Sequence, residues 1–428
     1  MASEKWPTLP LGDLTENFDG RRVPVKGPDR RSGPYPYYGA SGIVDRVDGY
    51  LFDGEYLLIG EDGENLRTRQ TPVAFIATGK FWVNNHAHIV RGNHRANTRF
   101  LSYALSQIDI SGYLTGSTMP KLTQGNLNRI PVVAPPLADQ KTIASVLGAL
   151  DDKIELNRRM NATLEAMARA LFQSWFVDFD PVRAKMERSD IQAQRSAADR
   201  DGRPLAALNP ATASLFPDSF QGSEAGHIPK GWTVGKVSDV ATLNRGAVNP
   251  GDFPTETFDH FSLPAFDNGR TPKVQLGSAI MSNKFTVTPN SVLLSKLNPH
   301  IPRIWLPDLH ASRRSVCSTE FMVACSKPGV SREYLFSLFT SSAFASIYGT
   351  LVTGTTGSHQ RIRPESVLDM KIVIPSPSLI RAFTDISKPM FDRINRNTDQ
   401  SRTLATLRDT LLPKLLSGEL SVAEKLTT

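Results

Sequence analysis

The chain has 428 residues, of which 40% are hydrophobic and 21% charged, with a net charge of +7. This length is enough for two or three domains, and the composition is that of an ordinary globular protein rather than a disordered or fibrous one. Two cysteines, Cys317 and Cys325, are too few for a disulfide framework and fit a reducing compartment. No apolar run approaches the roughly 18 residues of a membrane span, and the first residues lack a signal-peptide core, so a cytoplasmic location is expected.

The first 136 residues are expected to fold as one mixed α/β domain. Two apolar runs, Tyr50–Phe52 and Tyr56–Ile59, flank Asp53–Gly54, a dipeptide that is typical of a two-residue turn. The pattern therefore predicts a hairpin at this point. Further elements are predicted as strands at Val73–Ile76 and Ala87–Val90 and a short helix beginning over Arg99–Leu105.

A long helix is predicted directly after Pro135–Pro136, from Leu137 to Phe176. Its seam positions recur in alternating steps of four and three residues, which is the spacing of a coiled coil. At about 1.5 Å per residue the helix is about 60 Å long, and so narrow an apolar stripe needs a partner helix. The seam consists of Ile143, Leu147, Leu150, Ile154, Asn157, Asn161, Leu164, Ala168, Leu171 and Trp175.

An aromatic face, formed by Phe172, Trp175, Phe176 and Phe179, closes this helix and is interpreted as an anchor that docks the helix end onto a domain. Residues 179–228 are polar and interrupted by prolines, so we expect a linker. Residues 229–378 are expected to form a second domain. Its strands are predicted at Ser291–Ser295 and Glu320–Ala324, and residues 421–428 are expected to form a tail.

The partner helix lies in the same chain, because the sequence repeats itself. Shifting the seam by 240 residues keeps the residue class at seven of its ten positions. Upstream, Leu127–Pro135 matches Val367–Pro375 at the same shift, and Trp6 matches Trp232 at a shift of 226. The chain is thus predicted to contain two copies of one unit, each a globular portion followed by a long helix, with the second helix over residues 379–420. The shifted seam consists of Phe383, Ser387, Met390, Ile394, Asn397, Ser401, Leu404, Arg408, Leu411 and Leu415.

We expect the two helices to pair antiparallel, with Asn157 opposite Asn397. This register lets the two asparagines hydrogen-bond each other, which disfavours slipped registers. It also brings four apolar pairs together, namely Ile143 with Leu411, Leu150 with Leu404, Leu164 with Met390 and Leu171 with Phe383.

The sequence lacks the motifs of the enzymes that act on nucleotides and nucleic acids. It contains no GxxxxGK[ST] loop, no HExxH, no Asn-Pro-Pro-aromatic clamp of amino-methyltransferases and no nuclease pattern of Pro-Asp followed by Glu-x-Lys. His86 and His88 alternate on one predicted strand face, but no third metal ligand is suggested nearby. They are interpreted as solvated strand histidines. We therefore expect no catalytic residue, no cofactor and no metal.

Polar, cationic loops occur at matching places in the two globular portions. Thr115–Lys121, Thr353–Arg363 and Lys296–Arg303 combine cations with groups that can approach phosphates and base edges. The globular portions also hold a basic excess, with 15 Lys/Arg against 13 Asp/Glu in residues 1–136 and 15 against 10 in residues 229–378. This excess favours a polyanionic partner, although many basic proteins have none. The candidate DNA-binding residues are Ser117, Thr118, Lys121, Lys296, Asn298, Arg303, Thr355, Thr356, His359, Gln360 and Arg361.

Several of these segments resemble the specificity (S) subunits of type I restriction–modification systems. The resemblance is carried by the two-fold repeat and by four runs, IPVVAPPLADQKTI from Ile130, FQSWFVDFDPV from Phe172, GHIPKGW from Gly226 and LLSKLNP from Leu293. The second helix departs from the family pattern, because PSPSLIR from Pro375 replaces the Pro-Pro-Leu-x-x-Gln run.

The resemblance implies an α+β fold of two pseudo-repeated α/β target recognition domains, separated by a long antiparallel two-helix coiled coil. Residues 1–136 and 229–378 would each read one half of a gapped double-stranded DNA target. The helices over 137–178 and 379–420 would form a spacer that holds two methyltransferase (modification) subunits, to which restriction/translocase subunits are added. The chain would supply specificity and no catalysis.

Two other classes remain open on the sequence alone. A DNA enzyme with an unrecognised site would methylate or cleave DNA as the purified chain. A coiled-coil scaffold without DNA readout would show no affinity for DNA at low salt, even with its partner subunits present.

Overall fold

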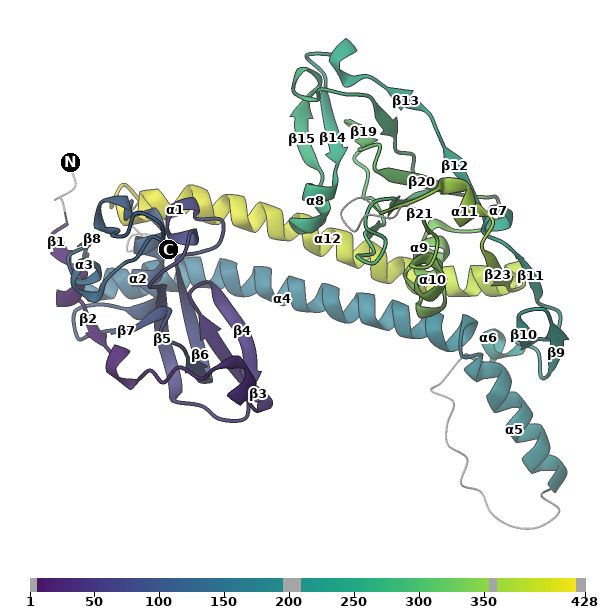
Figure 1. The fold of residues 1–428 in the computed structure, drawn as a ribbon, viewed down its shortest axis with the longest axis horizontal. Coiled ribbons are helices and arrows are strands. Elements are labelled where there is room, and N and C mark those ends of the chain that lie inside the picture. Colours follow the sequence, from purple (N-terminus) through teal and green to yellow (C-terminus); the bar gives the residue numbers. More distant parts are fainter. Residues whose placement is uncertain (1–5, 195–208, 354–359, 421–428) are drawn as a thin grey trace, which may run out of the picture. The chain divides into compact units, whose positions relative to one another are not determined.

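The computed structural model describes residues 6–194, 209–353 and 360–420 (Figure 1). The chain divides into two compact units, of which unit 1 comprises Met1–Asn157 with Asp399–Thr428, and unit 2 comprises Arg158–Thr398. Two long helices, α4 (Leu137–Phe176) and α12 (Pro377–Leu416), run through both units. Each unit therefore contains one globular part and one half of each helix. The mixed helix and strand content confirms the expected fold class.

A six-stranded sheet with the order β2-β7-β5-β6-β3-β4 forms the centre of unit 1. Two further strands, β1 and β8, form a separate antiparallel pair. The strands are β1 (Thr8–Pro10), β2 (Thr15–Asn17), β3 (Ser32–Gly39), β4 (Gly42–Val47), β5 (Phe52–Gly60), β6 (Ala74–Val83), β7 (Ala87–Gly92) and β8 (Pro131–Val133). The helices are α1 (Asn65–Thr68), α2 (Thr98–Gln107), α3 (Gln124–Asn128) and the single 3₁₀ turns η1 (Leu11–Asp13), η2 (Asp19–Arg21), η3 (Gly27–Asp29) and η4 (Ser111–Tyr113).

Strand β5 is continuous, so the hairpin predicted at Asp53–Gly54 is wrong. Both sides of this dipeptide pair with the same neighbour, β6, with Asp53 opposite Lys80 and Gly54 opposite Gly79. The two glycines have φ values of 130° and 73°, a conformation that glycine adopts at little cost. Pairing with β6 thus outweighs the local turn preference. The strands predicted around Val73–Ile76 and Ala87–Val90 and the helix over Arg99–Leu105 are confirmed as parts of β6, β7 and α2.

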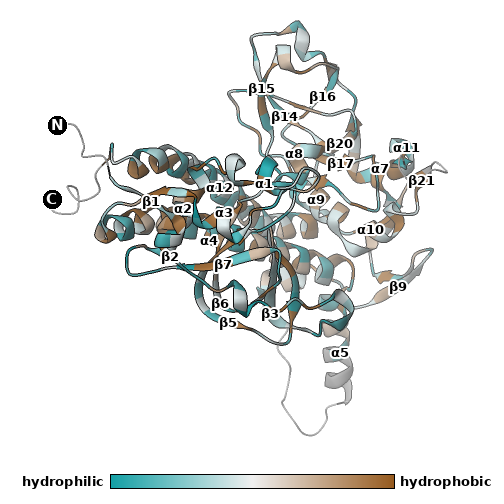
Figure 2. Cartoon of the chain, turned by 60° about the vertical axis from the view of Figure 1, so that its left-hand side comes forward, coloured by the Kyte–Doolittle hydropathy of each residue, from teal (hydrophilic) through white to brown (hydrophobic). Residues whose placement is uncertain are grey.

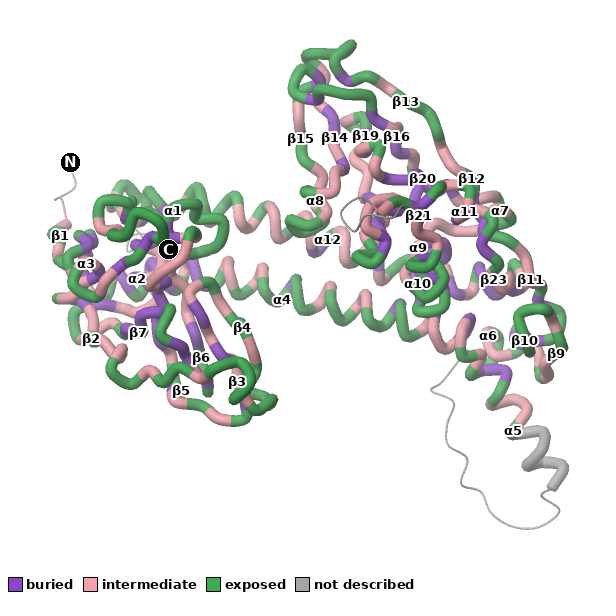
Figure 3. The backbone as a smooth tube through the Cα atoms, in the orientation of Figure 1, coloured by how far each residue is buried: buried purple, intermediate pink, exposed green. Residues whose placement is uncertain are grey.

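The core of unit 1 joins the sheet to the long helices. Helix α2 buries Phe100 and Leu101 in a cluster that also contains Leu57 of β5. The same cluster includes Ile143 of α4 and Leu415 of α12. The sheet strands are largely buried, as the purple segments of β5 and β7 show (Figure 3). The globular part and the helix ends of this unit therefore share one core.

Gln140 ties the first turn of α4 to the start of α2. Its side chain is 1% exposed and accepts a hydrogen bond from Asn97 N over 2.9 Å. It donates to Arg95 O over 3.0 Å and to Pro135 O over 2.8 Å. At the matching place in α12 stands Ile380, which is buried in apolar surroundings. The two helix starts are thus anchored by different chemistry, which accounts for the departure seen in the sequence.

Unit 2 contains two sheets, one of four strands in the order β12-β20-β17-β18 and one of five in the order β13-β16-β19-β14-β15. Its strands are β9 (Phe220–Ser223), β10 (Gly226–Pro229), β11 (Thr233–Lys236), β12 (Ala241–Asn244), β13 (Ala247–Val248), β14 (Thr257–Phe261), β15 (Lys273–Leu276), β16 (Lys284–Thr286), β17 (Ser291–Ser295), β18 (Ile304–Trp305), β19 (Arg314–Cys317), β20 (Phe321–Ser326), β21 (Val352–Thr353), β22 (Arg361–Ile362) and β23 (Lys371–Ile374). Its helices are α5 (Asp180–Gln194), α6 (Pro210–Ser214), α7 (Val237–Val240), α8 (Leu263–Asp267), α9 (Arg332–Thr340), α10 (Ser342–Tyr348), α11 (Pro364–Leu368) and the 3₁₀ turns η5 (Pro250–Asp252) and η6 (Gly277–Ala279).

The segment expected as a linker, residues 179–228, contains helices α5 and α6 and the strands β9 and β10. Two of its apolar residues, Phe216 and Ile228, are buried in the core of unit 2. The described parts of this segment therefore contribute to the core of unit 2. The predicted strands at Ser291–Ser295 and Glu320–Ala324 are confirmed as β17 and part of β20.

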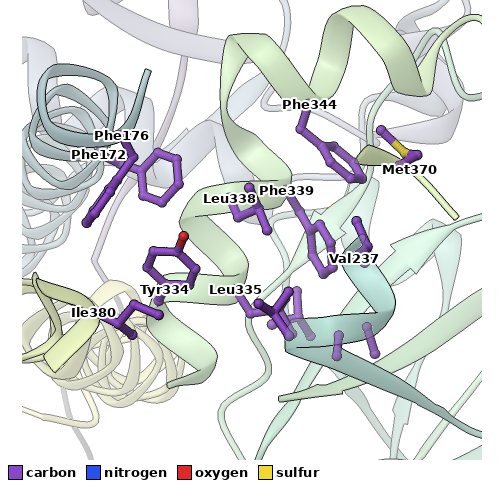
Figure 4. Close-up of a cluster of buried hydrophobic side chains, with 14 of the residues drawn as sticks. Phe172, Phe176, Val237, Tyr334, Leu335, Leu338, Phe339, Phe344, Met370 and Ile380 are labelled. Carbon is purple, nitrogen blue, oxygen red and sulfur yellow. The ribbon is translucent and has the colours of Figure 1, made fainter. Parts of the chain in front are cut away.

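The aromatic end of α4 lies in the core of unit 2, which confirms its interpretation as an anchor (Figure 4). The Phe176 ring lies 5.3 Å from Tyr334 of α9 and 5.5 Å from Phe383 of α12, centroid to centroid. Trp175, 2% exposed, meets Phe216 at 5.1 Å with an edge-to-face geometry. Edge-to-face pairs of this kind add to the free energy that the buried area itself provides. The end of α4 is thus fixed to the globular part of unit 2.

The long helices pair antiparallel within each unit, as predicted. In unit 1, Asp151 of α4 forms a salt bridge of 2.7 Å with Arg408 of α12, and Asn157 Nδ2 donates to Gln400 Oε1 over 2.9 Å. In unit 2, Asn397 Nδ2 donates to Asn161 Oδ1 over 2.8 Å. These polar partners lie three to five residues, about one turn, beyond the expected register of the seam. Each described seam position on both helices is at least partly shielded from solvent.

Hydrophobic and hydrophilic residues alternate along both helices (Figure 2). No helix within the described ranges combines the length and apolar character that crossing a membrane requires. Cys317 and Cys325 are both buried and form no disulfide.

The backbone pairing reproduces the repeat that the sequence predicts. In unit 1, Leu9 of β1 lies opposite Val132 of β8, and in unit 2 Gly235 of β11 lies opposite Ile372 of β23. These positions are related by the shifts of 226 and 240 residues found in the sequence. The two globular parts therefore share this strand pair at equivalent positions of the repeat.

Candidate nucleic-acid interface

In unit 1, the Thr115–Lys121 loop lies beside the residues that follow strand β5. Lys121 forms β-bridges with Thr115 across the loop and with Asp62 after the strand. Leu122 N donates to Glu61 O over 2.8 Å and continues this pairing. The predicted polar loop is thus fixed at the end of a central sheet strand.

Unit 2 has the same arrangement after strand β17. Leu297 forms a β-bridge with Arg361, and Ile362 N donates to Lys296 O over 3.0 Å. Asn298 N donates to Gln360 O, also over 3.0 Å. Four of the predicted site residues are thereby brought together from two segments that are distant in the sequence. They are Lys296, Asn298, Gln360 and Arg361.

We call these two arrangements the site strand pairs, Glu61–Gly63 with Pro120–Leu122 in unit 1 and Lys296–Asn298 with Gln360–Ile362 in unit 2. Their backbones match in detail. Gly63 has a φ of 107° and Asn298, at the equivalent place, a φ of 51°. Each of these residues donates its N–H to the residue before the loop cation, Pro120 or Gln360. Lys121 therefore corresponds to Arg361 in the backbone pairing.

Each site strand pair presents a cation that a carboxylate holds. Lys121 Nζ lies 3.3 Å from Glu61 Oε1, and Arg361 Nη2 lies 2.8 Å from Glu320 Oε1. The side chains of Lys121 and Arg361 are 51% and 59% exposed. Half-exposed cations on an ordered backbone are suited to contacting phosphates or guanine edges.

The carboxylate that holds the loop cation comes from a different position in each unit. The counterpart of Glu61 is Lys296, and the counterpart of Glu320 is His86. This follows because Lys296 N donates to Glu320 O over 2.8 Å, as Glu61 N donates to His86 O. Burial lowers the pKa of the Lys296 ammonium, a shift that the nearby Glu320 charge opposes. The two sites thus share a backbone and a loop cation but present different side chains.

The other predicted site residues lie in different settings. Ser117 and Thr118 are exposed in the Thr115–Lys121 loop. Arg303 turns its guanidinium to Asp267 of α8 in a two-point salt bridge of 2.7 and 2.9 Å, with its side chain 14% exposed. Thr355, Thr356 and His359 lie outside the described residues.

Arg67 of α1 is a residue at this site that the sequence did not single out. Its Nη2 donates to Gly116 O over 3.1 Å and to Ser117 O over 3.4 Å, so it holds the loop through two backbone carbonyls. Its side chain is 42% exposed. No local pattern marks it, because its role arises from contacts with a loop about fifty residues further along the chain.

The interpretation of both strand histidines as solvated is wrong for His88. His86 is half-exposed and faces Asp62 at 2.8 Å, whereas the His88 side chain is 1% exposed. His88 Nδ1 lies 2.5 Å from Asp19 Oδ2, and Nε2 lies 2.7 Å from Leu122 O. His88 is buried by two elements that cover its strand, η2 and the site strand pair. The alternation of residues along a strand does not reveal which elements cover it.

Asp19, Glu61 and His88 have ligand atoms within 4.8 Å of one another, which is the spacing of a metal site. Protein cations already occupy these acceptors. Arg22 Nη1 lies 2.6 Å from Glu61 Oε2, and Arg22 Nη2 lies 3.5 Å from Asp19 Oδ2. Burial raises the pKa of Glu61, but the hydrogen bond from Arg22 and the charges of His88 and Arg22 outweigh this and lower it. The cluster is an ion-pair network that needs no metal for its charge balance.

Comparison with known proteins finds similar chains of one family. Residues 3–166 match the family model described as the type I restriction modification DNA specificity domain. The HindI specificity subunit of Haemophilus influenzae is 25% identical over 414 residues, covering 86% of this chain and 84% of that protein. The MjaIX specificity subunit of Methanocaldococcus jannaschii is 24% identical and covers 98% of this chain and 94% of that protein.

Other similarities are local or concern the fold alone. A Haemophilus influenzae protein named as a type I restriction enzyme specificity subunit, S.HindORF215P, is 41% identical over 145 residues, covering 33% of this chain and 36% of that protein. The crystal structure of an S subunit from M. genitalium has a TM-score of 0.59 with 12% identity, and covers 97% of both chains. The repeated globular parts and long helices thus define a protein with a specificity-subunit fold. The match of residues 3–166 to the family model and the similarity to whole specificity subunits confirm the resemblance found in the sequence.

Proposed function

We propose that this chain is the DNA-binding, non-catalytic subunit of a type I restriction–modification complex, in which each globular part reads one half of a bipartite, gapped double-stranded DNA target. The observation that carries the proposal is the duplicated site strand pair with an exposed cation at equivalent places, Lys121 and Arg361. A duplicated site suits a target of two halves, because each copy can contact its own phosphates and base edges.

The differing side chains on matching backbones support two different half-site sequences. Glu61 and Lys296 occupy the same place and have opposite charge. Glu61 is paired with Arg22 and Lys121 and so sets the position of the loop cation, whereas an ammonium at this place, as in Lys296, can donate to guanine O6 and N7. The two copies are therefore equipped to discriminate between different bases, and the recognised DNA should be asymmetric.

We further propose that the paired helices hold two methyltransferase subunits, to which restriction/translocase subunits attach. Large apolar side chains remain exposed on the helices away from both cores, which supports a protein partner there. In this assignment residues 1–136 and 229–378 are recognition domains, 137–178 and 379–420 are spacer helices, and 179–228 connects them. The exposed apolar residues are Leu156 and Met167 of α4 and Ile386 and Leu407 of α12.

Methylation mapping tests the proposal. The chain is expressed with its methyltransferase subunits, and the methylated adenines of the host genome are sequenced. We expect a motif of two short specified blocks separated by a gap of fixed length and free sequence. The purified chain alone should transfer no methyl group and cut no DNA.

Two results would refute the proposal. Methyl transfer or cleavage by the purified chain would make it an enzyme in its own right. Failure of the assembled complex to bind DNA at low salt would instead favour a scaffold without DNA readout.

A further inference from the structure

His88 is a buried side chain that contacts the site strand pair of unit 1. Its Nδ1 faces the Asp19 carboxylate at 2.5 Å, and its Nε2 faces the Leu122 carbonyl oxygen at 2.7 Å. A carbonyl oxygen can only accept a hydrogen bond, so Nε2 carries a proton. Asp19 is held as an acceptor by the N–H of Ile89 at 2.8 Å and by Arg22, so Nδ1 carries a proton as well. His88 is therefore an imidazolium.

This imidazolium connects directly to the loop cation. Its acceptor Leu122 follows Lys121, and the Leu122 N–H is bonded to Glu61 O in the site strand pair. The Glu61 carboxylate in turn lies 3.3 Å from Lys121 Nζ and 3.9 Å from His88 Nδ1. The charged groups that face His88 are thus Asp19 and Glu61, with Arg22 and Lys121 paired to them. The hydrogen bond from His88 Nε2 to Leu122 O therefore fixes the strand that carries Lys121.

Unit 2 lacks this anchor. The sheet registers place Ile59 opposite His88 in unit 1 and Leu294 opposite Met322 in unit 2. Because the strands are otherwise equivalent, Met322 is the counterpart of His88. Met322 is buried, with 4% exposed, and carries no proton that titrates. The two sites therefore differ in whether a titratable group fixes the loop.

We propose that His88 is a positioning residue whose imidazolium holds the Lys121–Leu122 strand in the conformation that reads DNA, so that reading of the first half-site depends on pH and reading of the second does not. This inference rests on the proposed function. His88 contacts no DNA itself and acts through Leu122 and Lys121.

The direction of the pH dependence follows from the surroundings of His88. Burial opposes its charge, but the hydrogen bonds to Asp19 and Leu122 and the charges of Asp19 and Glu61 outweigh burial and raise the pKa of His88 above its ordinary value. A raised pKa keeps the imidazolium at neutral pH. As pH rises through that value Nε2 loses its proton, because the Asp19 carboxylate keeps the proton on Nδ1, and the hydrogen bond to Leu122 O is lost with it. Recognition of the first half-site should therefore be intact at and below neutral pH and should weaken in the alkaline range.

The test measures binding of the assembled methyltransferase complex to three duplexes, one with the full target and one with each half-site altered. The ratio of dissociation constants gives the discrimination at each half-site, and it is followed from neutral to alkaline pH. We expect discrimination at the first half-site to fall about tenfold or more across this range, since hydrogen bonds to charged groups are lost. Discrimination at the second half-site should stay constant.

Two variants separate a proton-dependent role from mere packing. His88→Met, which copies unit 2, should give a low and pH-independent discrimination at the first half-site. Asp19→Asn removes the carboxylate that stabilises the imidazolium, so the midpoint of the pH profile should move to lower pH. A purely structural role would lower discrimination in Asp19→Asn without moving the midpoint. Unchanged wild-type discrimination at the first half-site into the alkaline range would overturn the inference, even if His88→Met does not fold.

Lys121→Ala distinguishes failure of this inference from failure of the proposed function. If Lys121→Ala weakens binding while the pH profiles of the two half-sites are alike, His88 has no positioning role and the proposed function stands. If neither half-site is discriminated at any pH, the proposed function fails. Addition of a chelator should leave the profile unchanged, and loss of binding on chelation would overturn the inference in favour of a metal site.

Discussion

Replacing Lys121 by Ala isolates one cation of the proposed DNA-binding site and should leave the fold intact. The Lys121 side chain is 51% exposed, and its partner Glu61 keeps a second cation, because Arg22 Nη1 lies 2.6 Å from Glu61 Oε2. No buried carboxylate is left alone, so the free energy of unfolding should change by less than about 1 kcal/mol. Any larger effect on DNA binding then reports the contact to DNA.

The magnitude follows from counterion release. A contact to one phosphate contributes about 0.9 to the slope of the logarithm of affinity against the logarithm of salt concentration. Lys121→Ala should reduce the slope by about this amount, so that over a fourfold rise in salt the wild type loses about 3.5-fold more affinity than the variant. The loss at low salt should be similar for correct and altered targets, because a phosphate contact reads no sequence.

The assay is a salt titration of DNA binding by the assembled methyltransferase complex. Lys414→Ala, which removes an exposed cation from α12, is the matched control and should leave the slope unchanged. An unchanged slope for Lys121→Ala in a folded complex would refute its placement against phosphate. A loss confined to the correct target would instead make Lys121 a base reader.

Three further predictions concern stability and are measured by denaturant unfolding. Phe176→Ala should lower the free energy of unfolding by about 3–5 kcal/mol, because its buried ring is surrounded by other rings in the core of unit 2; a cost below about 1 kcal/mol would show that the end of α4 is not fixed by it. Gln140→Ala should cost about 1–3 kcal/mol, because its backbone partners at the start of α4 lose their hydrogen bonds; a neutral effect would contradict its role as a tie between α2 and α4. Asn161→Leu should lower the free energy of unfolding by about 1–3 kcal/mol because it deprives the buried Asn397 of an acceptor. Replacing Asn397 by Leu as well should recover much of this free energy, but the helix register should become less specific. A double variant no more stable than the single one would show that the two asparagines do not act as a pair.

The long helices and the duplication could be predicted from the sequence because both depend on periodicity. A seam with steps of three and four residues fixes a helix irrespective of what surrounds it, and α4 has the bounds that the seam predicted. The detailed register was off by about one turn, since side chains outside the seam contribute. Asp151 and Gln400, which lie outside the seam, bond to Arg408 and Asn157 within it, and a count of seam positions gives such polar contacts no weight.

Elements that depend on distant partners could not be predicted. The Asp53–Gly54 turn signal failed because β6 pairs with both sides of it. The environment of His88 depends on Asp19, which is 69 residues away, and no local pattern connects the two. By contrast, the loop cations Lys121 and Arg361 could be found, because the internal repeat of the sequence relates their positions in the two copies of the unit.

The most direct test of the central claim maps the methylated motif of a complex in which one site strand pair is disabled. The triple variant Lys296→Ala, Asn298→Ala and Arg361→Ala alters only unit 2, and sequencing of methylated adenines reports each block of the motif separately. We predict that one specified block becomes degenerate while the other block and the gap are retained. Retention of both blocks, or equal loss of both in a folded complex, would contradict the claim that each globular part reads its own half of the target.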